Sequence, residues 1–297
     1  MYSKERHVIK LFASDLDGTL LNFFHTMDGP IRSSIEEVVL SGAHFAIATG
    51  RTMRSNGDFG FEGLEVEAIA SNGALVFDRE GRLIGHAVMD RAFLEEMLNA
   101  FPQVCFECVG VGRSYVTGSL EAYTAGFGSK APLQKLVAIG AGSGRNPYVE
   151  QMVAGSDFDV SASEILSRDI CKVNARVTDA SLEAELHAFL AEHADTVVNT
   201  PFDPVMFEIS NVDTNKGAAV AWLAEFLGYS DDEVAVYGDG GNDIAMLERF
   251  EHSYATSNAS DAAKSAASEV IGPCALHAVP RHIRRTLRSQ RAYTQIA

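Results

Sequence analysis

The fold of this 297-residue chain is indicated most clearly by one segment, Asp15-Leu16-Asp17-Gly18-Thr19-Leu20-Leu21. It follows an apolar run, Val8 to Ala13, that has the length of a buried strand. Two carboxylates two positions apart in an extended chain point to the same side, and their repulsion is costly unless a cation lies beside them. Gly18 lets the chain turn away directly after the pair. The segment therefore indicates an acidic site for a divalent cation at the end of a strand.

The residues that follow alternate between helical and strand-like patterns. Pro30 opens a helical pattern that stops at Gly42, and Ala43 to Ala48 then forms a second apolar run. Glu67 to Ser71 has the pattern of a third strand. Because these runs are continuously apolar rather than alternating, both faces of the sheet are expected to be covered by helices. The pattern predicts an α/β fold with a Rossmann-like parallel sheet.

The same pattern returns near the C-terminus, after a middle block of different character. Thr214 precedes a helical segment closed by Gly228, and Glu233 to Tyr237 is a further apolar strand. The middle block mixes short strand candidates, two helices and glycine-rich turns. We therefore predict a discontinuous core made of residues 1–81 and 210–297, with residues 82–209 inserted as an α+β domain.

Four polar stretches end predicted strands or open the helices beside them, where an open α/β sheet places its active site. Besides the first segment, they are Thr49-Gly50-Arg51, Asn215-Lys216-Gly217 and Gly238-Asp239-Gly240-Gly241-Asn242-Asp243. A hydroxyl with a free amide can hold phosphate oxygens, and a lysine at a helix start attracts an anion. The later aspartates can complete a site of oxygen ligands for a hard cation. Each stretch alone is a weak signal, but four in order at strand-to-helix junctions predict one site.

Together these motifs resemble the haloacid dehalogenase superfamily, and within it the Cof-type phosphatases of sugar phosphates and related small molecules. Ser71-Asn72-Gly73-Ala74 and Asn258-Ala259 are also similar to that group. The resemblance covers residues 8–81 and 210–272. It implies that the inserted block is a cap of the large α/β type (type IIB).

The resemblance also implies a role for each matched residue. Asp15 is then the nucleophile that forms an aspartyl-phosphate, and Asp17 the general acid and base. Mg²⁺ is the implied cofactor. Its implied ligands are Asp15, Asp17, Asp239 and Asp243, and the residues implied to bind the phosphoryl group are Leu16, Thr49, Gly50, Lys216 and Asn242.

Composition limits the partners and the compartment. The chain has 24 basic and 40 acidic side chains, a formal net charge of -16, so we expect no binding to nucleic acid. No apolar run approaches the roughly 20 residues needed to span a bilayer, and the N-terminus lacks a signal-peptide pattern. Four scattered cysteines do not suggest a disulfide framework. We expect a cytoplasmic protein, monomer or homodimer, that acts on a small phosphorylated metabolite.

Several alternatives stay open at this point. A phosphosugar mutase or phosphotransferase of the same fold is possible, and so is a non-catalytic regulatory relative that keeps the core as a scaffold. His25 lies close to the proposed site in sequence, and both contact with substrate and the absence of any role are open for it. Arginines 281, 284, 285, 288 and 291 recur at helical spacing, which fits either a solvated last helix or a helix docked on an acidic surface.

Overall fold

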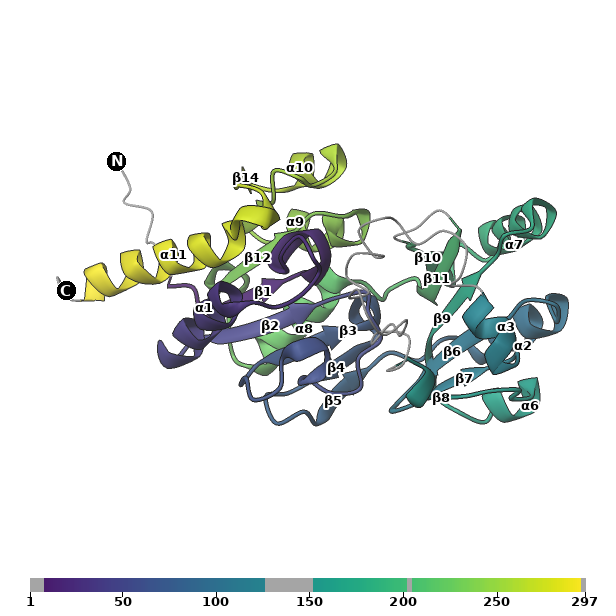
Figure 1. Ribbon diagram of the computed structural model, residues 1–297. Helices are drawn as coiled ribbons and strands as arrows, with labels where there is room; N and C mark the ends of the chain where they lie inside the picture. The colour runs from purple at the N-terminus through teal and green to yellow at the C-terminus, as the bar shows by residue number, and fades with distance from the viewer. Residues whose placement is uncertain (1–7, 126–151, 202–204, 295–297) are drawn as a thin grey trace. The chain divides into compact units, whose positions relative to one another are not determined.

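The computed structural model describes residues 8–125, 152–201 and 205–294. The chain separates into two compact units, one made of residues 1–85 and 215–297 and the other of residues 86–214 (Figure 1). The first unit is therefore discontinuous in sequence, and the second is inserted into it.

An eight-stranded sheet in the order β14-β13-β12-β1-β2-β3-β4-β5 forms the centre of the first unit. The neighbours from β14 to β3 pair in parallel, whereas β4 runs antiparallel to β3. This arrangement confirms the predicted α/β class with a parallel sheet. The strands are β1 (Leu11–Ser14), β2 (His44–Ala48), β3 (Glu67–Ala70), β4 (Leu75–Phe77), β5 (Leu83–His86), β12 (Val234–Gly238), β13 (His252–Ala255) and β14 (Glu269–Val270).

Helices cover both faces of this sheet, as the continuously apolar strands require. Leu11 and Ala13 of β1 face a core shared with Val220, Leu223 and Met246 of the helices on one side. Helix α11 packs against α1 on the other side (Figure 1), where Tyr237 of β12 meets it. The helices are α1 (Gly29–Leu40), α8 (Lys216–Phe226), α9 (Ile244–Arg249), α10 (Asp261–Ala266) and α11 (Ala278–Thr294).

The second unit has a six-stranded sheet in the order β10-β11-β9-β6-β7-β8, in which only β7 and β8 pair in parallel among the described pairs. One face is apolar: Phe106 and Val173 pack with Met97 and Leu186 of the covering helices. The opposite face is polar and includes the ion pair of Lys172 with Glu208, 2.8 Å.

The elements of this unit are β6 (Phe106–Gly110), β7 (Ser114–Val116), β8 (Ser156–Asp157), β9 (Ile170–Arg176), β10 (Val197–Asn199), β11 (Met206–Asn211), α2 (Arg91–Ala100), α3 (Leu120–Ala125), α6 (Ala162–Ile165) and α7 (Ala180–Glu192). The chain passes from one unit to the other after residues 85 and 214, a few residues beyond the predicted boundaries at 81/82 and 209/210. The reason is strand pairing, because β5 joins the first sheet and β11 is paired in the second.

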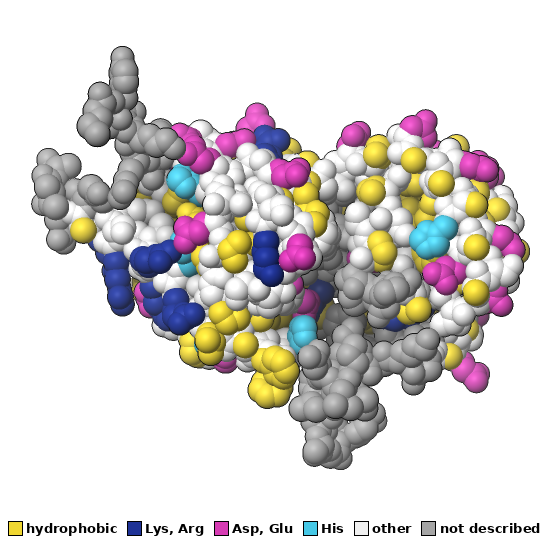
Figure 2. All heavy atoms as spheres, turned by 90° about the horizontal axis from the view of Figure 1, so that it is seen from above, with side chains coloured by type: hydrophobic (Ala, Val, Ile, Leu, Met, Phe, Trp, Pro, Cys, Tyr) yellow, Lys and Arg dark blue, Asp and Glu magenta, His cyan; other side chains and the backbone are white. Residues whose placement is uncertain are grey.

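The C-terminal helix α11 docks on the core of its own chain. Val279, Ile283 and Leu287 are buried along its inner side. Arg284 donates to Glu37 of α1 at 2.8 Å. Arg281, Arg285 and Arg288 line the same surface hollow as Arg284, and Figure 2 shows a patch where Lys and Arg side chains gather. The helix therefore docks on its own core through apolar side chains, whereas arginines 281, 285, 288 and 291 of its basic face stay exposed to solvent. Among the described residues, no helix combines the length and apolar character needed to cross a membrane.

His282 of α11 makes folding sensitive to acid. Burial lowers its pKa from 6.5 to about 4, and its Nδ1 shares a 3.0 Å hydrogen bond with the buried Tyr237 hydroxyl. Because the unfolded chain takes up this proton at higher pH than the folded chain, stability is full above pH 6.5 and falls as the pH drops toward 4. We expect up to about 3 kcal/mol of the free energy of unfolding to depend on this group.

The measurement is denaturant unfolding of the wild type and of His282→Asn at pH 7.5, 6, 5 and 4. The variant is expected to be less stable at pH 7.5 but to lose less stability on acidification. Parallel pH curves for the two proteins would contradict this assignment.

Candidate active site

The carboxyl ends of three adjacent parallel strands bring the predicted residues to one edge of the sheet. Asp15 follows β1, Thr49 follows β2 and Asp239 follows β12, and β1 lies between the other two strands. Because neighbouring parallel strands end at the same edge, residues more than 200 positions apart become neighbours there. Lys216 joins them as the first residue of α8.

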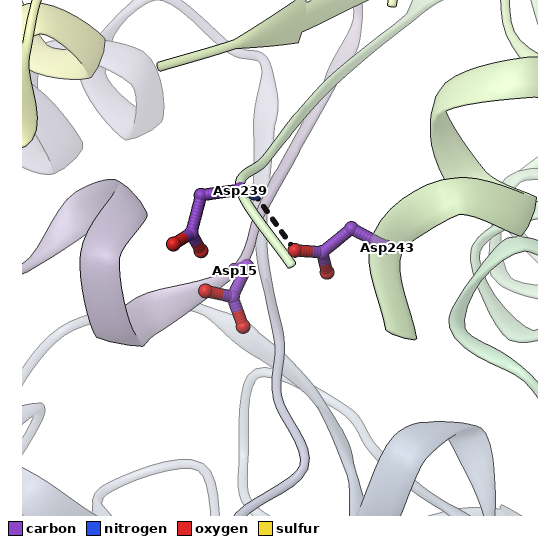
Figure 3. Close-up of side chains that lie close together, drawn as sticks. All are labelled: Asp15, Asp239 and Asp243. Atoms are coloured by element: carbon purple, nitrogen blue, oxygen red, sulfur yellow. Dashed lines mark hydrogen bonds between the residues drawn. The ribbon is translucent and has the colours of Figure 1, made fainter. Parts of the chain in front are cut away.

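Three carboxylates form an acidic cluster at this edge. Asp15, Asp239 and Asp243 each offer an oxygen within 4.8 Å of the others (Figure 3). Asp243 also shapes the loop, because its Oδ2 accepts hydrogen bonds from the backbone amides of Asp239, 2.8 Å, and Gly240, 2.9 Å. Its Oδ1 accepts from Lys216 Nζ at 2.7 Å, so both Asp243 oxygens already have hydrogen-bond donors. Asp15 and Asp239 are therefore the members of the cluster with carboxylate oxygens open to a ligand.

Lys216 lies buried between two members of the cluster. Its Nζ donates to Asp15 Oδ1 at 2.6 Å and to Asp243 Oδ1 at 2.7 Å, and its side chain is 0% exposed. The helix that carries it is capped by Asn215, whose side chain accepts a hydrogen bond from the Ala218 amide and so sets the direction of the first turn. The ammonium group therefore stands at a fixed place beside the predicted nucleophile.

The turn after β1 must be made by a residue without a side chain. Gly18 has φ +84°, and a Cβ there would lie 2.2 Å from Asp239 Oδ2. The next residue, Thr19, donates its hydroxyl to Asp239 Oδ1 at 2.9 Å. The Asp-x-Asp-Gly-Thr segment thus closes against the loop after β12, where its glycine leaves room for the Asp239 carboxylate and its threonine holds it.

The electrostatics of the cluster favour a cation. Burial and the neighbouring carboxylates of Asp243 and Asp239 raise the pKa of Asp15 well above its usual value, against the opposing charge of Lys216. Burial and Asp243 likewise raise the pKa of Asp239, to about 6. One ammonium group does not neutralise three carboxylates, so the donor set fits a divalent cation with oxygen ligands.

Asp17 is turned to other partners. Its two carboxylate oxygens accept from Arg51 Nε, 2.7 Å, and Nη2, 2.6 Å, and His25 Nδ1 lies 2.7 Å from Oδ1. Burial opposes the ionisation of Asp17, but the hydrogen bond with His25 and the charge of Arg51 outweigh it, so its pKa is well below the usual range. Its carboxylate is not among the three that form the acidic cluster of the described residues.

The residues predicted to hold a phosphoryl group lie on the neighbouring loops. Thr49 Oγ1 accepts from the Arg51 amide at 3.1 Å, and Asn242 donates to the side chain of Asn72 at 3.0 Å. A Cβ at Gly50 would lie 2.9 Å from that same Asn72 oxygen, so a side chain there would displace Asn72. Leu16, whose amide completes the predicted set, directly follows Asp15 in a short helical turn (Leu16–Leu20).

Four residues at this edge had no predicted role in the site. Asn72 connects the loops after β2 and β12, and Thr19 holds Asp239. Arg51 and His25 both bind Asp17. Thr19, Arg51 and Asn72 stand inside motifs that the sequence showed, so motif membership was an available signal for them. His25 lies in a loop outside the motifs, and its closeness in sequence to the first motif had left both contact with substrate and the absence of any role open.

The Lys216 ion pairs are expected to support the fold as well as the site. In Lys216→Met, two buried carboxylates would lose their cation, which typically costs about 3–5 kcal/mol. We expect a loss of this size in urea unfolding with a chelator present. The double variant Lys216→Met/Asp243→Asn should recover part of it, because one uncompensated charge is then gone. Equal stability of Lys216→Met and wild type would contradict this view of the cluster.

Comparisons with known proteins agree on the family. A family model described as haloacid dehalogenase-like hydrolase matches residues 12–283. This chain therefore belongs to the haloacid dehalogenase-like hydrolases, and the similarity to their Cof-type phosphatases that its motifs indicated is confirmed.

Several relatives that are named phosphatases match most of the chain. Phosphatase YwpJ of Bacillus subtilis is 26% identical over 278 residues, covering 88% of this chain and 94% of the relative. The 5-amino-6-(5-phospho-D-ribitylamino)uracil phosphatase YcsE of the same organism is 24% identical over 268 residues, 88% of this chain and 89% of the relative. A haloacid dehalogenase-like hydrolase structure from B. subtilis has 26% identity and a TM-score of 0.77, over 93% of this chain and 99% of that one. The protein is thus a phosphatase of this family.

Proposed function

We propose that the protein is a Mg²⁺-dependent phosphatase that hydrolyses small phosphorylated metabolites through an aspartyl-phosphate on Asp15. The proposal is carried by the surroundings of the Asp15 carboxylate. Its Oδ1 lies 2.6 Å from Nζ of the buried Lys216, and carboxylate oxygens of Asp239 and Asp243 lie within 4.8 Å. A carboxylate nucleophile needs no base at neutral pH, but it must approach an anionic phosphate. Positive charge beside it is therefore the main requirement.

The acidic cluster supplies the place for that charge. Asp15 and Asp239 would hold Mg²⁺, with Asp243 behind them, where it fixes the loop backbone and Lys216. Asp17 is included among the proposed metal ligands because it lies two positions after Asp15 in the same segment. In the structure its carboxylate contacts Arg51 and His25. When bound, the ion would offset the charge between nucleophile and phosphate and stabilise the transferring group.

The chain's own residues would perform the two half-reactions. An Asp15 oxygen attacks phosphorus, a new O–P bond forms, and the ester O–P bond breaks as Asp17 gives a proton to the leaving oxygen. Asp17 then takes a proton from water, which attacks the aspartyl-phosphate and releases inorganic phosphate. Lys216, Thr49, Gly50, Asn242 and the Leu16 amide would hold the phosphoryl oxygens and balance their charge.

The substrate proposal stays at the level of a class. One relative is a phosphatase of a phosphoribityl compound, a phosphate ester on a sugar-alcohol chain, which supports small phosphorylated metabolites as the class for this chain. The net charge of -16 disfavours nucleic acid. All four cysteines are free thiols, which is compatible with the proposed cytoplasmic location. A monomer or a homodimer remains the proposed assembly.

Two other functions would keep the same fold. A mutase or phosphotransferase would pass the phosphoryl group from Asp15 to a second hydroxyl, and a regulatory relative would bind without turnover. The buried cluster favours a catalytic role, because three crowded carboxylates are costly to keep without a task. Release of inorganic phosphate in equal amounts with the alcohol product distinguishes hydrolysis from both.

Turnover of an aryl phosphate tests the proposal directly. With 4-nitrophenyl phosphate we expect hydrolysis that requires Mg²⁺ and stops in chelator. Asp15→Asn should lose nearly all turnover, at least about a thousandfold, because an amide is a poor nucleophile. Asp261→Asn, at the start of α10 and outside the site, is the matched control and should keep wild-type rates. Unchanged turnover in Asp15→Asn would exclude the covalent mechanism.

Cation binding can be measured without turnover. When Mg²⁺ is added to wild-type protein from which a chelator has removed metal ions, the melting temperature is expected to rise. The reason is that a ligand that binds only the folded state stabilises that state. Asp239→Asn should remove most of that increase, since it neutralises one of the two open carboxylates. An equal increase in the variant and the wild type would place the ion elsewhere.

A further inference from the structure

The last helix concentrates positive charge in a strongly acidic chain. After Glu269 the sequence contains no aspartate or glutamate, although the whole chain has 40 of them. One hollow on the surface of α11, which we call the basic hollow, is lined by Arg281, Arg284, Arg285, Arg288 and Ser289. None of these residues belongs to the proposed active site, so the proposed function leaves this gathering of charge unexplained.

The helix beneath the basic hollow is held in place from its other side. Ile283 and Leu287 are buried in the core of the first unit. The Gln290 side chain accepts a hydrogen bond from the Ile9 amide at 3.1 Å and donates one to the Ile9 carbonyl at 3.2 Å. The arginines therefore project from a fixed support, and a ligand would not have to order the helix on binding.

Two arginines of the basic hollow have an acidic partner. Arg284 Nε donates to Glu37 at 2.8 Å, and Arg285 Nη2 lies 3.7 Å from a carboxylate oxygen of Glu269. Neither glutamate lines the hollow itself. Four guanidinium groups therefore stand against two carboxylates, which leaves two positive charges without a balancing group.

The unbalanced charges belong to Arg281 and Arg288. Both side chains are exposed, and neither takes part in an ion pair among the residues that the structure describes. They lie seven positions apart, which is about 10 Å along a helix. Arg281 Nη2 also lies beside the backbone of Gly272, where a Cβ would come within 3.2 Å of it. The two free cations thus mark the two ends of a short basic row.

Linked phosphate groups fit this row in charge and in length. A guanidinium group binds phosphate oxygens through two parallel N–H bonds, which makes arginine well suited to phosphate recognition. A single phosphate would meet only part of the row, whereas two or three linked phosphates extend along it. Ser289 adds a hydroxyl that can donate to a further oxygen. We propose that the basic hollow binds the pyrophosphate or triphosphate group of a small molecule.

Larger anionic partners match the surroundings less well. The net charge of -16 opposes the approach of a long polyanion, whereas a small anion responds mainly to the local field of the four arginines. Membrane binding by a helix of this kind needs apolar side chains that enter the lipid. Those of α11 face the core of its own unit instead. A small soluble ligand is therefore the occupant that the hollow favours.

Calorimetric titration with sodium pyrophosphate tests the site without any need for turnover. With a chelator present, the three carboxylates of the acidic cluster repel anions, so binding at the active-site edge is disfavoured. In Arg281→Gln/Arg288→Gln we expect the Kd for pyrophosphate to rise at least about tenfold, because two charge-assisted contacts are lost. Inorganic phosphate should bind the wild type at least about tenfold more weakly than pyrophosphate does.

The matched control is Arg82→Gln/Arg249→Gln, which removes two exposed arginines of the same unit outside the hollow and changes the net charge equally. Its Kd should stay within about threefold of the wild type. Melting temperatures show whether both double variants are folded.

Several results would overturn the proposal. These are a wild type that does not bind pyrophosphate, unchanged binding in Arg281→Gln/Arg288→Gln, and equal weakening in the two double variants. Binding of phosphatidylserine vesicles without binding of pyrophosphate would overturn it in favour of a lipid surface. Since every readout is binding, a failure of the proposed phosphatase activity would leave this test intact.

Discussion

The buried ammonium group of Lys216 is the interaction around which the active-site edge is arranged. It bonds to Asp15, at the end of the first strand, and to Asp243, more than 200 residues later, so it joins the two halves of the discontinuous core. Such a group is stable in the interior only because two carboxylates surround it. Asp243 in turn bonds to the backbone amides that shape the Asp239 loop. Fold and site therefore depend on the same few charges.

The excess of negative charge at this edge makes it suited to bind a cation. Three carboxylates share one ammonium, and the raised pKa values of Asp15 and Asp239 reflect that imbalance. A cation-binding phosphatase requires this state, because the ion must be attracted before an anionic substrate can be. Asp17 stands apart, with Arg51 and His25 meeting its charge. Four aspartates along one edge are thus divided by their partners into a cluster suited to a metal and a separate carboxylate that Arg51 and His25 keep ionised.

The helices that cover the two faces of the central sheet position different side chains. One is covered by α8 and α9, and α8 begins with Lys216, so the packing of this face places the ammonium group. The other is covered by α1 and α11, where His282 meets Tyr237 beneath the sheet. A loop that starts after the first motif and ends at the cap of α1 carries His25 to Asp17. Helices on both faces thus position groups at the shared edge.

The sequence by itself determined the sheet class, the discontinuous core and the motif residues, because continuously apolar strands, helix caps and strand-end motifs are local patterns. It predicted that Asp15, Lys216, Asp239 and Asp243 share a site, since parallel strands end at one edge. It did not determine that α11 docks through Ile283 and Leu287, because burial depends on which surface a helix meets. Only the tertiary structure decided three contacts: Arg51 with Asp17, Asn242 with Asn72, and His25 with Asp17. Each depends on how loops fold, and no periodicity in the sequence encodes their turns.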